Sequence, residues 1–143
     1  MSDKETELKE KFRIALTSTA KVIADNFEIN NNISDNKKTK DLNPIEIDNL
    51  TNPGDFIRLR AEVDSFALKK KFSSDEIYRK NLPPNNSSRS LYNIAEKIRY
   101  EMLGGKMLKG IEKNFNENYT QIINHKRKGQ LKTKEDVPVT EAF

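Results

Sequence analysis

Acidic and basic side chains in two stretches of this sequence are the residues best suited to chemistry. Asp64, Glu96 and Glu101 are carboxylates, while Arg60 lies four positions before Asp64 and Arg99 lies three after Glu96. If the two stretches are facing helices, the carboxylates could bind a divalent cation or hold one acid at a raised pKa. The alternative is a network of ion pairs that fixes helix against helix, beginning with Arg60 and Asp64 on one helix. The two arginines nearly match the three carboxylates in number, which favours the network of ion pairs over a metal site.

The other residue types exclude the common catalytic centres. There is no cysteine and one histidine, His125, so the ligands of a typical zinc site and the base of a catalytic triad are lacking. The triplet Gly104-Gly105-Lys106 lacks the first glycine, the final Ser or Thr and the preceding strand of a phosphate-binding loop. No glycine fingerprint for dinucleotides occurs either. We therefore expect no metal, no cofactor and no ATP site in this chain.

Apolar residues recur at three- and four-residue spacing over four segments, which predicts an all-α domain of four main amphipathic helices. The segments are Glu7–Phe27, Asp55–Phe72, Arg89–Leu103 and Lys106–Lys126, with a short helical turn over Ser74–Asn81. The predicted core-facing residues are Leu8, Phe12, Leu16, Ala20 (or Thr19), Ile23 and Phe27; Phe56, Leu59, Val63 and Phe66 (or Ala67); Leu91, Ile94 (or Ala95), Ile98 and Met102; Leu108, Ile111, Phe115, Tyr119 and Ile122 (or Ile123); and Ile77 and Tyr78 of the turn.

Local signals predict where these helices begin and end. Asp55, Ser73 or Ser74, and Ser88 are the expected N-caps. The Gly104-Gly105 pair is expected to stop the third main helix, because glycine is favoured just past a helix end.

Two further segments fall outside the helical pattern. Residues 28–54 are rich in Asn, Asp, Lys, Ser and Thr, which predicts a long mobile loop that is an insertion or a hinge. Residues 137–143 resemble the opening of another helix, so we expect a truncated product.

Composition and charge bound the class of protein. The chain has 143 residues, of which 34% are hydrophobic and 34% charged, so we expect one domain with a modest core. No signal peptide and no apolar run of about 20 residues occurs, which favours a cytoplasmic location and no membrane contact. The net charge is +4, and the basic run His125–Lys134 is read as a solvated turn rather than a binding patch. No RNA- or DNA-binding motif appears, so nucleic acid is not the expected partner.

Two motifs resemble a known family. Residues 60–69, RAEVDSFALK, are similar to R-G-x-A-D-S-x-A-L-R, and the helix-like stretch Lys11–Ala24 precedes them. The pattern A-R-x-x-[FY]-x-x-x-E-x-x-R-x-E-x-[LI]-G, followed by M-x-G-[VI]-x-x-N, is matched by Arg89, Tyr92, Glu96, Arg99, Glu101, Leu103, Gly104, Gly110, Ile111 and Asn114, with Met107 shifted by one position. In their order and spacing these motifs resemble the CobT-type subunit of aerobic cobaltochelatase, over most of the chain outside residues 28–54.

The resemblance implies a non-catalytic coupling or assembly subunit for ATP-dependent insertion of cobalt into the corrin ring, in cobalamin biosynthesis. In that family a large subunit holds the corrin and the metal, and an AAA+ subunit hydrolyses ATP. The complex uses ATP, Mg²⁺ and Co²⁺. The family's C-terminal von Willebrand factor A domain, with its D-x-S-x-S motif, is absent here, so residues 1–143 correspond to the N-terminal helical domain.

On this interpretation a set of motif residues fixes the helix packing that presents a docking face to the AAA+ subunit. They are Arg60, Asp64, Glu96, Arg99, Glu101, Gly104 and Gly110. Two alternatives stay open: a stand-alone binding module that uses the basic run on nucleic acid or an acidic protein, and an enzyme that uses Asp64 and Glu96 on a divalent metal. A homo-oligomer also stays open.

Overall fold

The computed structural model describes residues 3–25 and 51–129. Over these residues the chain forms five helices and no strand, which confirms the predicted all-α class. The helices are α1 (Asp3–Ala24), α2 (Pro53–Phe72), α3 (Asp75–Asn81), α4 (Asn86–Met107) and α5 (Lys109–Gly129). Most of the predicted loop and the predicted helix opening at 137–143 lie outside the described residues. Within the described ranges, no helix combines the length and apolar character that crossing a bilayer requires.

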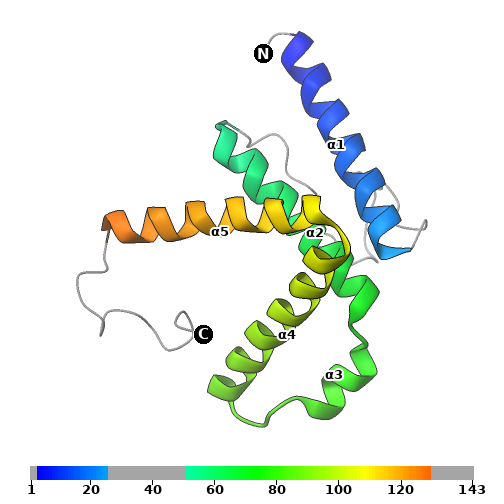
Figure 1. Ribbon diagram of the computed structural model, residues 1–143, viewed down its shortest axis with the longest axis vertical. Helices are drawn as coiled ribbons and strands as arrows, with labels where there is room; N and C mark the ends of the chain where they lie inside the picture. The colour runs from blue at the N-terminus through cyan, green and yellow to red at the C-terminus, as the bar shows by residue number, and fades with distance from the viewer. Residues whose placement is uncertain (1–2, 26–50, 130–143) are drawn as a thin grey trace.

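Helix α2 lies at the centre of the arrangement (Figure 1), and α1, α4 and α5 all pack against it. Helices α4 and α5 also contact each other near the joint that connects them, and from there they diverge as the two arms of a V. The short α3 follows the end of α2. The central position of α2 explains why its buried residues are small or aliphatic, because helices pack against it from several sides.

The core forms where α1, α4 and α5 meet α2. Its buried hydrophobic residues are Leu16, Ala20, Ile23, Ala24, Leu59, Ala61, Val63, Ala67, Leu68, Tyr100, Ile111 and Phe115. Phe12 and Phe56 pack against this cluster with their ring centroids 5.1 Å apart in an edge-to-face arrangement, which aromatic quadrupoles favour. The helical periodicity identified Leu16, Ala20 and Ile23 on α1 and Leu59 and Val63 on α2, but it missed Ala24, Ala61 and Leu68.

Several predicted core residues are instead exposed. Leu8 is 67% exposed, Met102 58% and Ile77 62%, and Leu108 and Ile122 are also exposed. Periodicity shows which residues share a helix face, but it does not show whether another element covers that face. In the described part of the chain, nothing covers these side chains.

The helix ends follow capping chemistry, with shifted positions. The N-cap of α2 is Asn52, and Asp55 occupies the third helical position of a capping box, with each side chain accepting the other's backbone N–H at 3.1 Å. Ser74 caps α3 as predicted, whereas α4 is capped by Asn85 and not by Ser88. Helix α1 begins at Asp3, four residues before its predicted start.

The predicted stop at Gly104-Gly105 is wrong, because α4 continues through both glycines to Met107. Leu108 alone separates α4 from α5, and its backbone N–H donates to the carbonyl of Gly104 at 2.9 Å. A Cβ atom at Gly104 would lie 2.3 Å from Cδ1 of the fully buried Leu68. The missing side chain at Gly104 therefore lets α4 approach α2 closely.

Helix α5 also runs further than predicted. It continues through His125 to Gly129, so this part of the basic run is helical and not a turn. The rest of that run lies outside the described residues.

Candidate partner-docking site

Asp64 joins α2 to α5 inside the molecule. It is 2% exposed, and its Oδ2 atom accepts a hydrogen bond of 2.7 Å from Nδ2 of Asn114, which is 7% exposed. Burial raises the pKa of Asp64, while the Asn114 bond and the charge of Arg60 oppose that rise. The predicted ion pair between Arg60 and Asp64 is wrong, because their charged atoms are not within 4.0 Å of each other. Asp64 instead bonds Asn114 of α5, and Arg60 is exposed.

Glu101 joins three helices. It lies on α4 and is 6% exposed, and its two carboxylate oxygens accept hydrogen bonds of 2.6 Å from Ser65 of α2 and Tyr119 of α5. Lys97 contributes a longer ion pair, with Nζ 3.7 Å from Oε1. Burial, together with the bond to Glu101, raises the pKa of the Tyr119 hydroxyl, so that this group is a hydrogen-bond donor at neutral pH.

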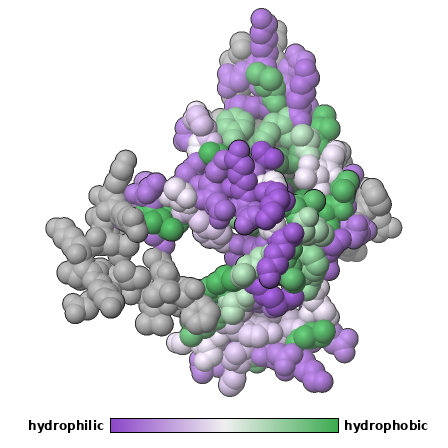
Figure 2. Space-filling view, viewed as in Figure 1, coloured by the Kyte–Doolittle hydropathy of each residue, from purple (hydrophilic) through white to green (hydrophobic). Residues whose placement is uncertain are grey.

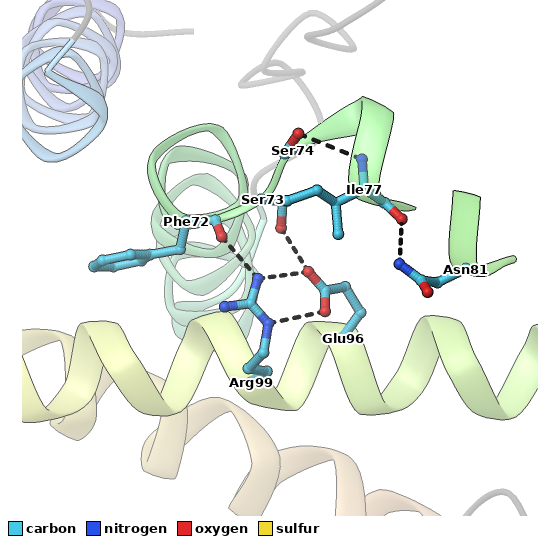
Figure 3. A network of polar contacts seen from close by, with 7 residues as sticks. All are labelled: Phe72, Ser73, Ser74, Ile77, Asn81, Glu96 and Arg99. Carbon is cyan, nitrogen blue, oxygen red and sulfur yellow. Dashed lines mark hydrogen bonds and ion pairs between the residues drawn. The ribbon is translucent and has the colours of Figure 1, made fainter. Parts of the chain in front are cut away.

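Glu96 and Arg99 fasten α4 to the end of α2 (Figure 3). Arg99 donates two hydrogen bonds to the Glu96 carboxylate, from Nε at 2.9 Å and from Nη2 at 2.6 Å. The same Nη2 donates to the carbonyl of Phe72 at 2.7 Å, and Ser73 donates to Glu96 at 3.0 Å. Phe72 is the last residue of α2, so its backbone carbonyl has no hydrogen-bond partner within the helix. Arg99 supplies that partner. The bonds from Arg99 and Ser73 lower the pKa of Glu96.

The three carboxylates therefore do not form one cluster. Asp64, Glu96 and Glu101 each bind a different set of partners. Across residues 3–25 and 51–129, no group of three or more acidic or histidine side chains is placed to hold a metal ion. Every buried polar side-chain atom in the described ranges has a hydrogen-bond partner. Such saturated contacts fix the packing of helices and leave no buried polar atom free for a ligand.

The two predicted glycines differ in their surroundings. Gly104 is buried against Leu68, as described above. Gly110, near the start of α5, is exposed, and an added Cβ would meet no other atom within 4 Å. Close packing explains a glycine at the first position and not at the second.

Four residues that donate hydrogen bonds to these carboxylates were not predicted from the sequence: Ser65, Ser73, Asn114 and Tyr119. Ser65 and Asn114 are polar residues on otherwise apolar helix faces, and both lie within the two motifs. That position was the available signal for a buried polar contact. Tyr119 was assigned to the apolar stripe, and Ser73 only to a helix cap, so their hydroxyl contacts could not be anticipated.

Between the arms of the V lies a groove of about 330 Å³, which we call the α4–α5 groove. It is lined by Ile98, Glu101, Met102, Gly105, Lys106, Lys109, Glu112, Phe115, Asn116 and Tyr119. Other apolar side chains of α4, α5 and the residue between them are also exposed, namely Leu103, Met107, Leu108, Ile122 and Ile123. Figure 2 shows hydrophobic surface facing the opening between α4 and α5 from both sides. Exposed apolar surface beside a groove is a common feature of sites that contact other molecules.

Comparison with known proteins identifies the family. The sequence matches the family model described as "Cobalamin biosynthesis protein CobT" over residues 6–143. No match was found among the curated proteins or among the solved structures. The family match confirms the resemblance carried by the two motifs. Because it spans nearly the whole sequence, the chain belongs to the CobT family of cobalamin biosynthesis proteins, which is related to cobaltochelatase.

Proposed function

We propose that this chain is a non-catalytic coupling or assembly subunit of an ATP-dependent cobaltochelatase, acting in the cytoplasm. Its partners are an AAA+ subunit, which hydrolyses ATP with Mg²⁺, and a large subunit, which holds the corrin ring and receives Co²⁺. The family membership supports the pathway, and the resemblance described above supplies the division of labour. In this division the chain contributes contact surfaces rather than reacting groups.

One observation carries the non-catalytic role. The carboxylates that were candidates for catalysis or metal binding already accept hydrogen bonds from other side chains of this protein. Asp64 accepts from Asn114, Glu96 from Arg99, and Glu101 from two hydroxyl groups. A general acid or base must reach its substrate within hydrogen-bond distance, and a metal ligand needs neighbouring ligands. Glu101 and Asp64 are almost fully buried and meet neither condition.

Conservative variants of the buried carboxylates test this role. Cobalt insertion is measured in a mixture of the AAA+ subunit, the large subunit and this protein, carrying Asp64→Asn or Glu101→Gln. We expect insertion to follow the amount of folded chain bound to its partners, as measured by circular dichroism and co-purification. A variant that folds and binds normally but abolishes insertion would assign a catalytic role to that carboxylate and overturn the proposal.

A further inference from the structure

We propose that the α4–α5 groove is the docking site for an amphipathic helix of the AAA+ subunit, one whose apolar stripe is flanked by carboxylates. The proposal rests on the proposed function, because it names the surface through which the chain would meet that partner. It goes further by stating where the contact lies and what chemistry the partner segment carries.

The walls of the groove have the spacing that suits a helix. Ile98 and Met102 lie four residues apart on α4, and Phe115 and Tyr119 lie four apart on α5, so each arm presents successive turns to the opening. Gly105 lies near the junction of the two arms, where a Cβ atom would lie 3.4 Å from Cβ of Glu112, so α4 and α5 approach each other closely there. Helices that bind in apolar grooves anchor themselves through side chains at three- and four-residue spacing.

Two side chains of the groove lining, Met102 and Tyr119, remain exposed, whereas Phe115 is buried in the core. Met102 is 58% exposed and Tyr119 37% exposed, although both lie beside the buried Glu101. Beyond the groove, Met107 and Leu108 are each 44% exposed at the turn between the arms. Methionine adapts its shape to a bound surface, which suits a contact that forms and dissociates.

The accessible charges of the groove lining, Lys106, Lys109 and Glu112, sum to a positive value. Lys106 and Lys109 line the groove, and the one ion pair of Lys109 with another described residue is to Glu112, at 3.1 Å between side chains that are 87% and 49% exposed. A pair that exposed is worth little in water, so the lysine can exchange it for a partner's carboxylate. The other acidic residue of the lining, Glu101, is buried with both oxygens occupied. Carboxylates beside the partner's apolar stripe complement this pattern, whereas a second copy of the groove would oppose lysine to lysine.

The groove is also held open before any partner arrives. Glu101 bonds Ser65 of α2 and Tyr119 of α5, and Gly104 seats α4 against Leu68. Both arms are therefore fixed against α2 at their closed end. A preformed groove lowers the ordering cost of binding.

The test compares two single substitutions, in the full chain, of apolar residues that are both more than half exposed. Met102→Glu introduces a charge into the groove, and Leu8→Glu introduces the same charge on α1, where Leu8 is 67% exposed. Neither residue belongs to the buried core, so both variants should keep the wild-type circular dichroism and melting temperature. The affinity of each protein for the immobilised AAA+ subunit is measured. We expect Met102→Glu to lower it at least tenfold and Leu8→Glu to leave it within twofold.

A charge-reversal pair tests the chemistry of the partner. Lys106→Glu with Lys109→Glu should weaken capture strongly at low salt and less at high salt, because screening weakens exposed ion pairs. Arg79→Glu with Lys80→Glu, a matched pair of exposed residues on α3, should have no such effect. Equal losses from the two pairs would show a general effect of net charge and overturn the groove as the charged contact.

The remaining outcomes separate the two proposals. If the wild-type chain and Met102→Glu bind the AAA+ subunit equally, the groove is not the docking site, although the proposed function stands. If the folded wild-type chain does not bind that subunit, both proposals fall. If Met102→Glu instead shifts the chain from dimer to monomer in light scattering and leaves capture unchanged, the occupant is a second copy and the proposal is overturned.

Discussion

Gly104 shows how a single missing methyl group can set the distance between two helices. A Cβ atom there would lie 2.3 and 2.4 Å from the two methyl carbons of Leu68, which is fully buried. Gly104→Ala must therefore displace Leu68 or push α4 away from α2, and such overpacking costs about 1–3 kcal/mol. We expect the free energy of unfolding, measured with a chemical denaturant, to fall by that amount.

Gly110→Ala is the matched control for that substitution. Gly110 is exposed in α5, and an added Cβ would meet no other atom within 4 Å. Alanine has the higher helix propensity, so stability should be unchanged or increased by up to about 1 kcal/mol. Equal losses at the two positions would mean that the contact between Gly104 and Leu68 does not set the helix spacing.

The Tyr119 hydroxyl provides a second prediction at the level of one residue. It donates to the buried Glu101 at 2.6 Å, and a hydrogen bond to a charged group is worth about 1.5–3 kcal/mol. Tyr119 is partly exposed, so we expect Tyr119→Phe to lower the free energy of unfolding by about 1.5–2 kcal/mol, at the low end of that range.

Tyr92→Phe is the control for this hydroxyl. Tyr92 is half-buried on α4, and its hydroxyl makes no hydrogen bond within the described ranges. Removing that hydroxyl should change stability by less than about 0.5 kcal/mol, as for most substitutions away from specific contacts. A loss at Tyr92 as large as that at Tyr119 would show that the bond to Glu101 contributes nothing specific.

At the level of helices, two carboxylates on different elements should give opposite pH dependences. Glu96, between α4 and the end of α2, has its pKa lowered by Arg99 and Ser73. Its stabilising contribution is therefore present above the unfolded pKa of 4.5 and is lost as the pH falls through the lower folded pKa. We expect the stability difference between wild type and Glu96→Gln to shrink as the pH is lowered below 4.5.

Asp64, between α2 and α5, should behave in the opposite way. Burial raises its pKa above 3.8, so the folded state binds the proton more tightly than the unfolded state does. Relative to Asp64→Asn, the wild type should lose stability as the pH rises from 3.8 through the folded pKa. Denaturant titrations of both variants from pH 3 to pH 7 check the pair, and slopes of the same sign would contradict the assigned environments.

The helices themselves could be predicted from the sequence because their cause is local. Apolar spacing located all five helical segments. The polar residues before the short segment identified Ser74 as a candidate cap. Contacts across helices could not be predicted in the same way. The role of Gly104 depends on Leu68, which lies 36 positions away, and the partner of Asp64 is Asn114, 50 positions away. The motifs marked these residues as a set, but only the packing of α2, α4 and α5 shows what each one contacts.

The whole molecule combines an interior whose described buried polar side-chain atoms are all hydrogen-bonded with an exposed apolar groove. Glu101 and Asp64 hold α2, α4 and α5 together, and the α4–α5 groove is what that packing presents to the outside. Disturbing the interior should therefore weaken partner binding indirectly. At equal total concentration we expect Gly104→Ala to lower the apparent affinity for the AAA+ subunit only in proportion to its loss of folded chain, whereas Gly110→Ala should bind as the wild type does. Binding is compared at equal concentrations of folded protein, and a residual deficit in Gly104→Ala would mean that the spacing of α4 also shapes the docking surface.

The central claim is that this chain couples through contact with an AAA+ partner, and its most direct test is the affinity of the purified wild-type chain for the AAA+ subunit from the same source. It is measured with ATP and without nucleotide, with helical folding verified by circular dichroism. The account predicts binding that strengthens when ATP is present, because a coupling subunit must respond to the nucleotide state of the motor. A folded chain that fails to bind under either condition, or binds only the large subunit, would contradict it.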